Sequence, residues 1–138
     1  MRVLVLDDDP ARLRAFKEKH GQDHDICAVE TAAEATERLA VGAPWDFVFL
    51  DHDLGGEVFV DSAGKNTGME VVRHICKVHP TIGFVVVHSL NARAGNEMVA
   101  KLRDAGYPAK YMPWAWEPHI YDVLNGNGDA VPSLTYTQ

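Results

Sequence analysis

The chain alternates short apolar runs with longer segments whose apolar residues recur at helical spacing, and this alternation limits the folds open to it. Each apolar run is five or six residues long, which is the length of a buried strand rather than of a helix. Strands are therefore predicted at residues 2–6, 25–29, 46–50, 83–88 and 109–113. Because helical segments separate these strands, we expect a three-layer, doubly wound α/β fold, in which a parallel sheet is covered on both faces.

Capping residues predict where the helices begin. Asp9 suits the N-cap of the first helix, with a proline at the next position. Thr31 and Thr67 each start a capping box, in which a glutamate follows three residues later. A fourth helix is expected to end near Gly106.

The length of the chain, 138 residues, suits a single domain with one core. We expect this domain to span residues 1–124 and to finish with a short helix at 117–124. Residues 125–138 contain turn residues without periodicity, which predicts a flexible tail or a segment that becomes ordered on a partner.

Composition excludes some classes of function. The formal net charge of -7 argues against an extended nucleic-acid surface, although a local basic patch would be compatible with it. No apolar run is long enough to cross a membrane, and the first one is too short for a signal peptide. Cys27 and Cys76 are far apart and lack metal-ligand spacing, so we interpret them as reduced packing residues of a cytoplasmic protein.

Acidic residues gather where the first and third strands end. Asp7 and Asp8 follow the first strand, and Asp51 and Asp53 follow the third. In open parallel sheets ligands bind outside the carboxyl ends of the strands, so these carboxylates are expected to converge if the two strands are neighbours. Carboxylates that close repel one another unless a cation lies between them. The sequence therefore predicts a site for Mg²⁺, or Mn²⁺, on these four residues, although Asp53 could instead begin the turn before Gly55.

The same segments resemble the receiver domain of bacterial response regulators. "VLVLDDDP" is similar to the first strand of that family with its acid pair, and "WDFVFLD" is similar to its third strand with the phosphoacceptor aspartate, here Asp51. The resemblance implies a flavodoxin-like sheet of order 2-1-3-4-5 and a phosphorelay in which Asp51 accepts a phosphoryl group beside Mg²⁺. It also implies that Asp8, Asp51 and the backbone carbonyl of Asp53 ligate the metal.

Three departures from the receiver pattern bear on this chemistry. The lysine that receivers carry before a proline after the fifth strand is replaced by Met112; Lys110 lies two residues earlier, and Arg93 is a conceivable substitute. His88 stands where receivers end the fourth strand with Ser or Thr, and Ser89 follows it. The loop after the third strand is also longer than in the family.

"LDHDLG" and "VHSLN" resemble a divergent branch, the cyclic-phosphate processing receiver domains, which are thought to act on phosphate ends of RNA or nucleotides. Histidines beside a metal could move protons near neutral pH. His52 could equally donate to a neighbouring carboxylate, and His88 could be a core histidine. The residues proposed for catalysis and for phosphate binding are Asp51, His52, His88, Ser89, Asn91 and Arg93.

Three functions are compatible with the sequence. The chain could be a metal-dependent phosphoesterase whose substrate is a phosphate-containing small molecule or an RNA end. It could be a signalling receiver with a histidine kinase as partner, or a binding domain without turnover. The long segment from Gly55 to Asn66 could act as a lid, and Trp114 and Trp116 could pack under the last helix or stack on a base.

Overall fold

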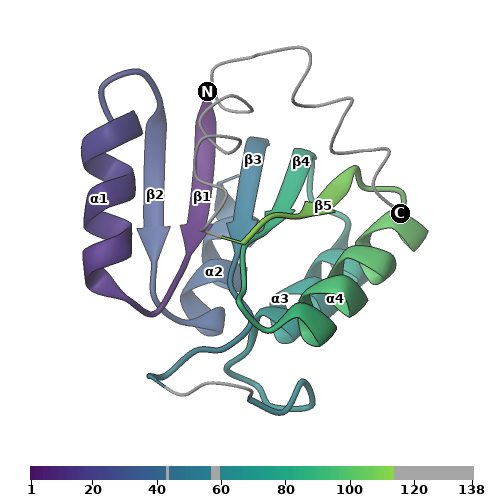
Figure 1. Cartoon of the computed structure of the whole chain (residues 1–138). Helices are drawn as coiled ribbons and strands as arrows, with labels where there is room; N and C mark the ends of the chain where they lie inside the picture. The colour runs from purple at the N-terminus through teal and green to yellow at the C-terminus, as the bar shows by residue number, and fades with distance from the viewer. Residues whose placement is uncertain (43, 57–59, 114–138) are drawn as a thin grey trace.

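The computed structural model describes residues 1–42, 44–56 and 60–113. Five strands form one parallel sheet of order β2-β1-β3-β4-β5, as Figure 1 shows. The strands are β1 (Arg2–Leu6), β2 (Asp25–Val29), β3 (Trp45–Leu50), β4 (Ile82–Val87) and β5 (Ala109–Tyr111). The predicted fold class and strand order are confirmed.

Helices lie on both faces of the sheet (Figure 1). They are α1 (Pro10–His20), α2 (Ala32–Val41), α3 (Gly68–Val78) and α4 (Ala92–Asp104). Side chains from α1, such as Phe16, pack with Val5 and Phe49 in one buried cluster. Alternate residues of the same strands point to the other face, where they pack with α2, α3 and α4 in a second cluster.

The helices begin where their caps were predicted. The side chains of Asp9, Thr31 and Thr67 each accept a hydrogen bond from a backbone N–H in the first turn of α1, α2 and α3. Asn91 caps α4 in the same way. The segment from Asn91 is therefore a helix start.

The strand register brings the ends of the three central strands level. Leu6 lies opposite Leu50, and Leu50 lies opposite Val87. The next residues of these strands, Asp7, Asp51 and His88, therefore lie in a row at the carboxyl edge of the sheet, with Asp51 in the middle. Strand β4 ends one residue before the predicted boundary, so His88 lies just beyond it.

Several expectations concern segments outside the described residues. These are the short helix at 117–124, the tail at 125–138, and both Trp114 and Trp116. Among the helices that the structure does describe, none is long and apolar enough to cross a bilayer.

Candidate functional site

Three carboxylates meet at the carboxyl edge of the sheet. One oxygen each from Asp7, Asp8 and Asp51 can be chosen so that all three lie within 4.8 Å of one another. Asp7 is fully buried and Asp51 is 6% exposed, while Asp8 is partly exposed and opens the group to solvent. The predicted convergence of these three residues is confirmed.

Backbone N–H groups hold the three carboxylates in place. Asp7 Oδ1 accepts from the N–H of Asp9 at 2.8 Å, and Asp51 Oδ1 accepts from the N–H of His52 at 2.8 Å. Asp8 Oδ2 accepts from the N–H of Gly56 at 2.7 Å. Gly56 has a φ of 78°, a backbone conformation that glycine adopts without strain. The turn at this glycine therefore lets its N–H reach the Asp8 carboxylate.

The environment of Asp51 favours its neutral form when no cation is bound. Burial and, to a smaller extent, the nearby charges of Asp7 and Asp8 together raise the pKa of the Asp51 carboxyl to about 7, against an opposing effect of Arg12. A divalent ion among these carboxylates would lower the pKa of Asp51 again, because the ion favours the ionised form of each carboxylate.

Arg12 is a site residue that the sequence reasoning missed. Its Nε and Nη2 atoms donate to the two oxygens of Asp7, each at 2.9 Å, in a bidentate pair. Nη2 also lies 3.8 Å from Asp8 Oδ1 and 3.9 Å from Asp51 Oδ2. The signal that could have found it is the spacing from Asp8 to Arg12, four residues apart across the start of α1.

His88 is fully buried beside Asp7. Its Nε2 donates to the carbonyl oxygen of Leu6 at 3.1 Å, and its Nδ1 lies 3.7 Å from Asp7 Oδ2. Burial lowers the pKa of His88 to about 4, although Asp7 acts in the opposite direction. The imidazole is therefore neutral near pH 7, with the proton on Nε2.

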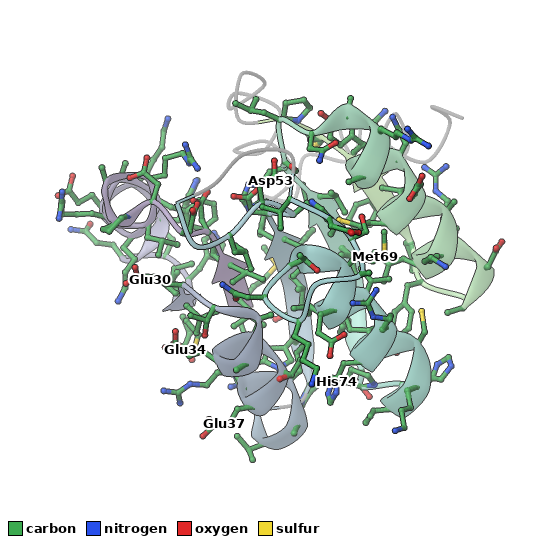
Figure 2. All side chains as sticks on the ribbon, turned by 90° about the horizontal axis from the view of Figure 1, so that it is seen from below. Glu30, Glu34, Glu37, Asp53, Met69 and His74 are labelled. Atoms are coloured by element: carbon green, nitrogen blue, oxygen red, sulfur yellow. The ribbon has the colours of Figure 1, made fainter. Side chains whose placement is uncertain are left out.

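His52 and Asp53 point into the long loop rather than into the group of three carboxylates. Nδ1 of His52 donates to Asp53 Oδ1 at 2.7 Å, and Nε2 accepts from the Ser62 hydroxyl at 2.9 Å. Asp53 Oδ1 also accepts from the N–H of Val60 and from Nδ2 of Asn91. The structure thus does not bring the Asp53 carboxylate into the group formed by the other acids; Figure 2, seen from this end of the sheet, labels Asp53 in the loop.

The residues predicted to bind phosphate lie beside this network. The Ser89 hydroxyl accepts from the N–H of Asn91 at 3.0 Å, and Asn91 in turn caps α4. Arg93 is highly exposed, and its guanidinium lies 3.7 Å from Glu97 instead of facing the acids. Ser62, Asn91 and Arg93 line a cavity of about 670 Å³ between the loop and α4.

The place of the family's lysine is filled by apolar side chains. Met112 is fully buried in the cluster on the α1 face of the sheet. Lys110 is 5% exposed and pairs with Val86 within the sheet, below the end of the strand. Among the described residues, the cation that contacts the acidic group is therefore Arg12, which comes from a different element.

Residues 62–67, at the end of the long loop, support neighbouring helices. Asn66 Oδ1 accepts from the N–H of Ala32 at the start of α2, and the Thr67 hydroxyl donates to the carbonyl of Gly64. Arg73 of α3 donates to the carbonyls of Ser62 and Gly64. These contacts tie the described part of the long loop to α2 and α3.

Comparison with known proteins gives one family. The family described as "Cyclic-phosphate processing Receiver domain" matches residues 2–104. No curated protein matches the chain closely enough to count as a relative.

Several solved structures share the fold. The response regulator TrrA from Thermotoga maritima, solved in complex with Mg²⁺ and BeF, is 20% identical with a TM-score of 0.64 and covers 94% of this chain and 97% of its own. A CheY-like receiver domain from Methanospirillum hungatei is 18% identical (TM-score 0.62; 96% and 94% covered). The N-terminal domain of an uncharacterized Wolinella succinogenes protein is 16% identical (TM-score 0.68; 94% of each chain).

Proposed function

The chain belongs to the cyclic-phosphate processing receiver domains, and from this membership we propose that it uses a divalent metal ion to bind and open a cyclic phosphate ester. The observation that carries the proposal is the convergence of Asp7, Asp8 and Asp51 at the end of the sheet. The substrate class proposed is a small phosphate-containing molecule or an RNA end.

The donor set fits Mg²⁺ or Mn²⁺. Carboxylate oxygens are the ligands that hard divalent ions prefer, and the partly exposed side of the group leaves room for retained waters. The Mg²⁺ in the TrrA structure, a receiver of the same fold, supports this choice of ion. When bound, such an ion would neutralise a phosphate oxygen and draw electron density from phosphorus. We propose Asp7, Asp8 and Asp51 as its side-chain ligands.

His88 is the better placed of the two histidines for moving a proton. Its Nδ1 lies 3.7 Å from Asp7 Oδ2. Because the ring is neutral near pH 7, this nitrogen can accept a proton. His52 reaches the cavity through Ser62, with which it shares a hydrogen bond. We propose that Ser89, Asn91 and Arg93 border the part of the substrate that lies beyond its phosphate.

Phosphoryl transfer to Asp51 is the second candidate function. Asp51 follows the third strand next to the acid pair, which is the arrangement of a phosphoacceptor, and a histidine kinase would then be the partner. Against it stands the buried Met112 at the place of the lysine that normally pairs with the phosphoryl group.

Turnover of 2′,3′-cyclic nucleotides separates the two candidates. With Mg²⁺ or Mn²⁺ we expect water to add to phosphorus while one ring P–O bond breaks, which gives a nucleoside monophosphate detectable by chromatography. The variants Asp51→Asn and His88→Asn should lose this turnover, while Asp104→Asn, an exposed acid at the far end of α4, should keep it. Absence of turnover together with a phosphoryl mass gain on Asp51 from a small phosphoryl donor would favour the signalling function.

A further inference from the structure

We propose that Arg12 is an internal cation that competes with the divalent ion for the three carboxylates, so that binding of the ion requires the guanidinium to leave. This inference rests on the proposed metal site and adds its regulation. It concerns a residue that neither the sequence motifs nor the family description assigns to the site.

The geometry places one nitrogen against all three acids. Nη2 of Arg12 lies 2.9 Å from Asp7 Oδ1, 3.8 Å from Asp8 Oδ1 and 3.9 Å from Asp51 Oδ2. The carboxylate oxygens that would ligate an ion lie within 4.8 Å of one another, so the ion would need the space that this nitrogen faces. Two cations that close repel strongly, above all where burial reduces screening by water.

Burial explains why Asp7 needs a cationic partner in the metal-free state. Its carboxylate has no exposure to water, so its negative charge would be costly without the two hydrogen bonds from Arg12. The fork of Arg12 satisfies both oxygens of Asp7 and offsets one negative charge of the group. A divalent ion supplies two positive charges at the same carboxylates, so it can replace the guanidinium there.

Arg12 also has a route away from the pocket. Its side chain is 40% exposed, and Nη1 lies 3.4 Å from Asp9 Oδ2 on the solvent side. A small rotation toward Asp9 would therefore keep the guanidinium paired with a carboxylate while it gives up Asp7. The ion would then take over the role of partner to Asp7.

Magnesium affinity measured by isothermal titration calorimetry tests this competition. Arg12→Gln should bind Mg²⁺ at least about tenfold more tightly than the unchanged protein, because a positive charge beside the ion is removed. Arg14→Gln is the matched control: it removes the same charge from an exposed position of the same helix, and its affinity should change by less than about twofold. Arg12→Lys, which keeps the charge, should stay near the unchanged protein.

Thermal unfolding gives a second readout that does not depend on turnover. Without metal, Arg12→Gln should melt at a lower temperature, because Asp7 loses both hydrogen bonds of the fork. Saturating Mg²⁺ should then raise its melting temperature by more than it raises that of the unchanged protein.

Each outcome decides something. Equal or weaker Mg²⁺ binding by Arg12→Gln would overturn the competition while leaving the metal site intact. If neither protein binds Mg²⁺, the proposed metal site itself is wrong. Should Arg12→Gln fail to fold, the side-chain Nε–H signal of Arg12 in the unchanged protein decides: Mg²⁺ should shift it and leave Arg14 unaffected, and no shift would refute the inference.

Discussion

At the scale of single residues, the site is governed by how three carboxylates are kept together. Asp7 is paired with the Arg12 guanidinium, and Asp8 accepts from a backbone N–H of the loop. Asp51 accepts from the N–H of His52, and its pKa is raised. The acids themselves could be predicted, because they follow the ends of two apolar strands. Arg12 could not be predicted from strand ends, since it is the third residue of helix α1.

The pKa of Asp51 predicts how metal-free stability depends on pH. In the unfolded chain this carboxyl titrates near 3.8, and in the folded protein at about 7. Because the folded state binds the proton more tightly, the stabilising contribution is complete below about pH 4 and is lost as the pH rises through 7. The loss is on the order of 4 kcal/mol over this window.

Urea unfolding of the unchanged protein and of Asp51→Asn, without metal at several pH values, measures this contribution. The variant cannot ionise, so its free energy of unfolding should rise relative to the unchanged protein between pH 4 and 8. A difference between the two proteins that does not vary with pH would contradict the shifted pKa. Added Mg²⁺ should reduce the difference at pH 8.

At the scale of elements, the start of α3 is pressed against the end of β3. The N–H of Gly68 donates to the carbonyl of His52, and a Cβ at this glycine would overlap the carbonyl oxygen of Asp51 and the methyl group of Met98. The capping box made the helix start predictable, but this close approach depends on tertiary packing and left no pattern in the sequence.

Gly68→Ala therefore tests how firmly α3 positions Asp51. In an open helix position this substitution would stabilise the protein by up to about 1 kcal/mol. Here we expect it to destabilise by about 1–3 kcal/mol, because the backbone must shift to admit the methyl group. Chemical denaturation measures the change, and a stabilised variant would show that the contact is loose.

The long loop is the element that sequence reasoning described least well. The length of the loop was apparent from the sequence. That Asp53 would accept hydrogen bonds within the loop was not, because this depends on the positions of Val60, Ser62 and Asn91 in the folded protein. Asp53 is the third residue after β3, close to the proposed metal ligands, yet its carboxylate accepts hydrogen bonds from the loop.

Asp53→Asn separates these two roles. The amide cannot accept the same set of donors as the carboxylate, so hydrogen–deuterium exchange at Val60 should become faster. Magnesium affinity should stay within about threefold, because the Asp53 carboxylate lies outside the group of three acids. A large loss of Mg²⁺ affinity with unchanged hydrogen exchange at Val60 would instead show that Asp53 is a metal ligand.

At the scale of the whole molecule, the parallel sheet creates the site. The level register of β1, β3 and β4 brings to one edge residues that are far apart in the chain, since Leu6 lies opposite Leu50 and Leu50 opposite Val87. Alternating apolar runs were enough to predict the sheet. The rule that ligands bind at carboxyl ends predicted where the acids meet only together with the strand order that the resemblance to receiver domains implied. Only the three-dimensional structure shows which side chains face the group of three carboxylates and which face the loop.

A crystal grown with Mn²⁺ would show whether the three carboxylates bind a divalent ion, because anomalous scattering locates the ion without assumptions about its ligands. We expect one strong anomalous peak at coordination distance from carboxylate oxygens of Asp7, Asp8 and Asp51, with the Arg12 guanidinium displaced toward Asp9. A peak elsewhere, or none at millimolar Mn²⁺ with Arg12 still paired to Asp7, would contradict this expectation.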